Sequence, residues 1–132
     1  MSNILGFSTP RKSSRCELLA TWLAGGTVRI YDGTRPTDAD TALGSQNLLV
    51  SFSVPNPAGS VTNGVFTASA ISQAQVSTAG TASWARVVDS SAVTIFDADV
   101  GVTSFGSVIE IDNVTLAQGS NCTVTSFVLT ER

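Results

Sequence analysis

The side chains best able to do chemistry in this sequence are two pairs of carboxylates. Asp38 and Asp40 are separated by one alanine, and so are Asp97 and Asp99. Acids at this spacing in a loop could chelate Ca²⁺, and paired carboxylates also carry out glycoside hydrolysis. Neither pair continues into a twelve-residue calcium loop, and in a strand both acids would share one face and favour water. We therefore interpret them as solvated acids, with a metal site and a glycosidase-type pair as the alternatives.

Other catalytic chemistries lack the residues they need. The chain has no histidine, which excludes histidine bases, histidine zinc ligands and Ser-His or Cys-His nucleophiles. Lys12 is its one lysine, and no glycine-rich phosphate loop opens a helix. Cys16 and Cys122 belong to no metal or redox motif, so we expect two buried thiols, with a disulfide as the alternative. The sequence predicts no catalytic residues, no cofactor, no metal and no enzyme.

Several residues remain as candidates for contacts or ion pairs. Arg29 with Asp32, and Arg86 with Asp89 or Asp97, are expected to form surface ion pairs worth little each. Aromatic residues could form a sugar-binding platform, but most alternate with Val and Ala and suit a core. Tyr31 is the exception, because we expect it to stand outward from a strand.

The candidate partner contacts are therefore one aromatic and four basic residues. Three of the basic residues cluster near the N-terminus, where a solvated helix face is the simpler interpretation. The candidates are Tyr31, Arg35, Arg11, Lys12 and Arg15.

Composition limits the class of protein. The 132 residues (13.6 kDa) suit one domain, with 42% hydrophobic residues and a mean hydropathy of +0.25. Only 13% are charged, against about 25% in a typical soluble domain, and the net charge is −3 with a pI near 4.6. Disorder and nucleic-acid binding are disfavoured, and no apolar run approaches the roughly 18 residues of a membrane span. The first residues do not resemble a signal peptide, so we expect synthesis in the cytoplasm.

The pattern along the chain predicts one helix followed by strands. Residues 9–26 read as the helix, with Thr9 as N-cap, Pro10 at the first helical position and Gly25-Gly26 as the left-handed end. Thereafter alternating segments are separated by turn signals every eight to fourteen residues, which is typical of a β-sandwich or barrel.

The predicted fold is all-β. It is an Ig-like or jelly-roll β-sandwich of seven to eight strands with a short N-terminal helix. The clearest alternation is Leu48, Val50, Phe52 and Val54, all expected to point inward. Serine and threonine make up about a quarter of the chain, so we expect outward strand faces polar through hydroxyls and small side chains.

The sequence resembles a group of small virion proteins of tailed phages and prophages. The likeness lies in the helix leading into residues 27–36 (TVRIYDGTRP), then residues 47–50 (NLLV), 78–89 (TAGTASWARVVD) and 122–130 (CTVTSFVLT). It covers most of residues 9–131 and marks strands and turns. Residues 1–8 depart from the pattern and are interpreted as an N-terminal arm, followed by one domain over residues 9–132.

The resemblance implies a virion structural protein, and we expect a head decoration or cement protein. Its partners would be the major capsid protein or other virion proteins, with itself as a homo-oligomer, a trimer among the options, and with no nucleic acid or membrane partner. It would be made in the host cytoplasm and reside in the virion. A tail or neck component, a receptor- or glycan-binding module using Tyr31, Asp38 and Asp40, and a β-sandwich unrelated to phages remain as alternatives.

Overall fold

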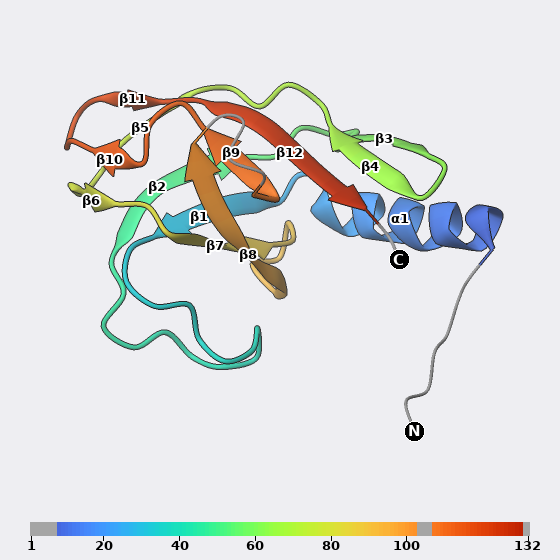
Figure 1. Cartoon of the computed structure of the whole chain (residues 1–132), viewed down its shortest axis with the longest axis horizontal. Helices are drawn as coiled ribbons and strands as arrows, with labels where there is room; N and C mark the ends of the chain where they lie inside the picture. The colour runs from blue at the N-terminus through green and yellow to red at the C-terminus, as the bar shows by residue number, and fades with distance from the viewer. Residues whose placement is uncertain (1–7, 103–106, 131–132) are drawn as a thin grey trace.

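The computed structural model describes residues 8–102 and 107–130, so the predicted arm lies outside the described residues except for Ser8. One helix precedes twelve strands in this part of the chain (Figure 1). The elements are α1 (Thr9–Leu23), β1 (Thr27–Tyr31), β2 (Leu48–Ser53), β3 (Gly59–Thr62), β4 (Val65–Ala68), β5 (Ala74–Gln75), β6 (Gly80–Thr81), β7 (Trp84–Val88), β8 (Thr94–Val102), β9 (Ile109–Ile111), β10 (Thr115–Leu116), β11 (Asn121–Cys122) and β12 (Val124–Thr130).

Eight strands form one curled sheet in the order β2-β1-β7-β8-β9-β12-β4-β3. Its neighbours are antiparallel except β8 and β9, which run parallel. Two small two-stranded sheets, β10-β6 and β11-β5, lie together beyond one end (Figure 1). The β-rich chain with one short helix is confirmed, but because the eight strands join in one order, two separate sandwich layers are not evident.

The hydrophobic core is built from both halves of this sheet. Val28, Ile30 and Phe52 come from β1 and β2, whereas Phe66 and Ile109 come from β4 and β9, and all are almost fully buried. Burial of apolar surface is worth about 25 cal/mol per Å², so these side chains supply much of the stability. The period-two alternation of the strands therefore positions the core as expected.

Helix α1 starts one residue earlier than predicted. Its N-cap is Ser8, which makes no side-chain capping hydrogen bond, and Thr9 is already helical. Pro10 lies in the first turn, where its missing N–H leaves no helical bond unmade. The predicted left-handed end is confirmed, since Gly25 has φ +75° directly after the C-cap Ala24.

The helix docks on the turn between β3 and β4. Asn63 and Gly64 both have positive φ (52° and 78°), as a tight two-residue hairpin turn requires. The Gly64 N–H donates to Ser13 Oγ at 2.9 Å, and Cys16 Sγ donates to the Gly64 carbonyl at 3.2 Å. These two bonds lock the register of α1 against the hairpin.

One detail of strand β2 differs from its predicted alternation. Leu48 is 39% exposed, whereas Leu49 is fully buried. The register between β1 and β2 shifts at Ile30 and Tyr31, so Tyr31 lies opposite Leu48. A register shift of this kind turns the side chains beyond it to the other face. Leu48 was therefore wrongly assigned to the core.

No helix in the part of the chain that the structure describes is long and apolar enough to cross a membrane.

Both cysteines are free and buried, which confirms the expectation of two thiols. Burial, with Asp112 close by, raises the pKa of Cys122 to about 11.

We predict that a thiol reagent such as DTNB at pH 8 labels neither cysteine in the native protein and both in denaturant, because the thiolate is the reactive form. Rapid labelling of the native protein would contradict this burial.

Candidate interaction surface

Four side chains form a row across the outer face of β1, β7 and β8. The row consists of Tyr31, Trp84, Arg86 and Asp97. The Tyr31 and Trp84 rings stack at 4.8 Å between centroids, and the Arg86 guanidinium lies 5.5 Å from the Trp84 ring centroid. Strand register creates the row, since Tyr31 is opposite Trp84 and Arg86 is opposite Asp97. We call this set the aromatic–ionic row.

The row contains a buried ion pair. Arg86 Nε and Nη2 donate to the two carboxylate oxygens of Asp97 at 2.8 and 3.0 Å. Their side chains are only 8% and 6% exposed, so the expected surface pair is in fact buried and bidentate. The hydrogen bonds that Arg86 donates to Asp97 raise the pKa of Arg86, which keeps its charge at all accessible pH values. Asp89 instead accepts from the backbone of its own turn.

Tyr31 does not stand outward as predicted. It is 3% exposed because it stacks on Trp84, whose indole Nε1 donates to the Asp32 carbonyl at 3.0 Å. A ring covered in this way offers no platform to a sugar. Sequence alternation placed Tyr31 on the outer face correctly but could not show that a loop covers that face.

The residues that follow Tyr31 form this covering loop, which spans residues 33–46 and is fastened at its ends. Asp32 accepts from the Asn47 backbone N–H (2.7 Å) and side-chain Nδ2 (3.2 Å). Gln46 Nε2 donates to the Thr34 carbonyl at 2.5 Å. The two hydrogen bonds from Asn47 lower the pKa of Asp32. A loop with such close ends is an Ω-loop, a class that often carries function.

The two acids within each carboxylate pair have different partners or roles. Asp97 is paired with Arg86, whereas Asp99 forms an exposed ion pair with Arg35 of the loop at 3.3 Å. Asp38 accepts from the Asp40 N–H and the Thr41 hydroxyl, which shapes the loop tip. Within residues 8–102 and 107–130, no three acids, cysteines or histidines gather as a metal site would require. The predicted Arg29–Asp32 pair is also not formed in these residues, because the Asp32 carboxylate binds Asn47.

Three of the four basic candidates, Arg11, Lys12 and Arg15, lie on α1, whereas Arg35 lies on the loop. Arg11 and Arg15 are exposed and share a shallow hollow with Ser14 and Leu18. The stem of Lys12 instead lies against the β3–β4 turn at Gly64. No acid lies in the first turn of the helix, so these cations stand where the helix dipole favours negative charge.

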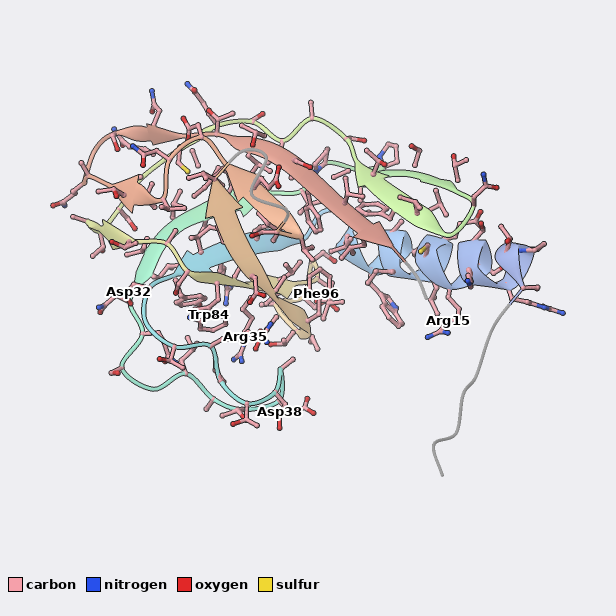
Figure 2. The ribbon with its side chains drawn as sticks, viewed as in Figure 1. Arg15, Asp32, Arg35, Asp38, Trp84 and Phe96 are labelled. Atoms are coloured by element: carbon pink, nitrogen blue, oxygen red, sulfur yellow. The ribbon has the colours of Figure 1, made fainter. Side chains whose placement is uncertain are left out.

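Exposed apolar residues that were not predicted from the sequence extend this helix surface. Leu18 is 52% exposed, Trp22 49% and Val93 61%. Trp22 and Val93 line one hollow together with Ile95, and the polar residues Asp89 and Thr94 complete its lining. Leu18 and Trp22 lie one helical turn apart, on a different stripe of the helix from the buried Cys16 and Leu23. This spacing is the sequence signal that could have revealed the exposed apolar side chains. Figure 2 shows Arg15 on α1, Phe96 on β8 and Asp38 on the loop.

No family model matches the chain, and neither a curated protein nor a solved structure is significantly similar to it.

The buried and exposed ion pairs give a matched stability test. We predict that Arg86→Ala lowers the free energy of unfolding by about 3–5 kcal/mol, because it leaves Asp97 buried without a partner. Arg35→Ala removes the exposed pair with Asp99 and should cost under about 1 kcal/mol. Urea denaturation followed by circular dichroism measures both. Equal losses in the two variants would contradict the distinction.

The fastening of the loop is expected to fail in acid. Because the folded pKa of Asp32 lies below its ordinary 3.8, its contribution is complete above that value and is lost as pH falls through the lowered pKa. The Asn47 amide signal in NMR should therefore stay constant from pH 7 to about 4 and shift below it. In Asp32→Asn the acid-dependent shift should disappear. A midpoint above 3.8 in the unmodified protein would overturn this assignment.

Proposed function

We propose that the protein is a structural component of a tailed-phage virion that decorates the outer surface of the head and stabilises the shell. The observation that carries this proposal is the nature of the exposed strand surface. The exposed strand positions of the described residues are Leu48, Ser51, Ser53, Ser60, Thr62, Thr67, Gln75, Thr81, Asp99, Val102, Thr115, Asn121 and Thr125. Asp99 is the one charged residue among them, and most are hydroxyls.

Such a surface suits repeated contacts with a rigid protein shell. Neutral polar and apolar contacts are little affected by ions, whereas exposed ion pairs weaken as salt is added. Many copies on one shell would also gain by avidity. The likeness of residues 27–36 and 78–89 to small phage virion proteins supports the same role.

The arrangement of reactive groups supports a non-enzymatic role. Among the described residues, Asp32 and Asp38 shape the loop, and Asp97 and Asp99 are paired with arginines. Each of these four carboxylates therefore already has a structural partner. We also propose that the two halves of the curled sheet act as the layers of a sandwich around the common core.

Binding to particles tests the proposal. Purified protein added to phage particles that lack it should sediment with them at hundreds of copies per particle, and binding should change less than about threefold between 50 and 500 mM NaCl. Ser51→Glu/Ser53→Glu, which charges the exposed face of β2, should weaken binding if that face meets the capsid, and Thr67→Glu tests β4 in the same way. Failure of the unmodified protein to bind at any salt concentration would refute the decoration role.

A copy number of only a few per particle would instead indicate that the protein is located in the tail or neck.

A further inference from the structure

We propose that α1 of one copy docks on the 33–46 loop of a second copy. The docking surface on the helix consists of Arg11, Arg15, Leu18 and Trp22, extended by Val93. Its partner surface is the exposed loop tip with Asp38, Asp40 and Leu43. This contact concerns the chain's assembly with itself and does not depend on the proposed role in the virion.

The apolar part of the contact comes from side chains that are costly to leave in water. Leu18, Trp22 and Val93 are between 49% and 61% exposed, and Trp22 and Val93 line the same hollow. Tryptophan at the centre of an apolar area is the residue type that most often dominates binding energy. Leu43 on the loop is 43% exposed and offers the matching apolar group.

Charge complementarity identifies a second copy as the occupant. Arg11 and Arg15 place two exposed cations beside Leu18 on a chain whose net charge is −3. Asp38 and Asp40 are both exposed at the loop tip, on either side of Ala39 and close to Leu43 in sequence. Each surface therefore combines two like charges with an apolar side chain, and the signs are opposite. Oppositely charged surfaces of this kind steer and orient association.

The fold keeps these two surfaces apart within one copy. Figure 1 shows α1 at one end of the molecule and the loop descending from the β1–β2 end. In Figure 2, Arg15 beside α1 and Asp38 at the bottom of the loop lie well apart in the view. A contact between copies uses both surfaces at once, either twice in a symmetric pair or once per copy around a ring.

The loop is held ready for such a contact. Asp32 and Asn47 fasten its base, the Asp38 carboxylate orders its tip, and Arg35 ties it to β8 through Asp99. A loop already ordered in its binding shape loses less entropy on association. The helix face is equally fixed, because its opposite side is locked to the β3–β4 turn by Ser13 and Cys16.

Charge exchange between the two surfaces tests the proposal. Sedimentation velocity of the full chain over 1–200 μM at 50 mM NaCl should show a concentration-dependent oligomer, weakened in 500 mM NaCl. Arg11→Glu/Arg15→Glu should weaken association by at least about tenfold, and Asp38→Arg/Asp40→Arg should do the same. The two variants mixed, or all four changes in one chain, should restore it. Trp22→Ser tests the apolar part, and Ser53→Glu is the matched charge control away from the contact.

Each outcome decides the proposal. Restoration by the charge exchange supports it, because misfolding of either variant could not be reversed by the other, and circular dichroism checks that each variant is folded. A monomer at every concentration overturns it, as does an oligomer that ignores all four charge changes. Particle binding without self-association would leave the decoration role intact and refute only this contact.

Discussion

The buried pair of Arg86 and Asp97 is the interaction on which the outer face of this molecule depends. Two charges held away from water are tolerated only when they satisfy each other, and here the fork of the guanidinium meets both carboxylate oxygens. The pair requires β7 and β8 to align in one register. The pairing of β1 with β7 sets Tyr31 opposite Trp84, which lies beside Arg86, so the two rings and the ion pair share one face of the sheet.

The positions of the loop and the helix follow from this frame and from the core. Asp32 directly follows β1. Its backbone carbonyl accepts a hydrogen bond from Trp84 Nε1, and its carboxylate accepts one from the Asn47 backbone N–H. At the other end of the strand order, Ser13 and Cys16 form hydrogen bonds with the β3–β4 turn. These bonds fix the orientation of the exposed face of α1. The molecule thus presents fixed surfaces, and within its described part no three acids, cysteines or histidines gather as a metal site would require.

Local patterns predicted much of the fold, and long-range pairings account for what they missed. The helix end at Gly25, the Asn63-Gly64 turn and the strand β1 follow from backbone preferences of single residues. Leu48 was misplaced because a register shift opposite Tyr31 depends on two strands at once. Tyr31 and Arg86 were expected at the surface because alternation identifies a face of the sheet but not the loop that covers it. The order of the eight strands likewise depends on pairings that no short segment encodes.

We propose that these neutral, rigid surfaces serve to decorate a phage head. The most direct measurement is a cryo-electron microscopy reconstruction of intact particles that contain the chain. The account predicts density that fits the curled sheet and α1 at symmetry-related positions on the outer head surface. Density for the chain on the tail alone, or none on the particle, would contradict it.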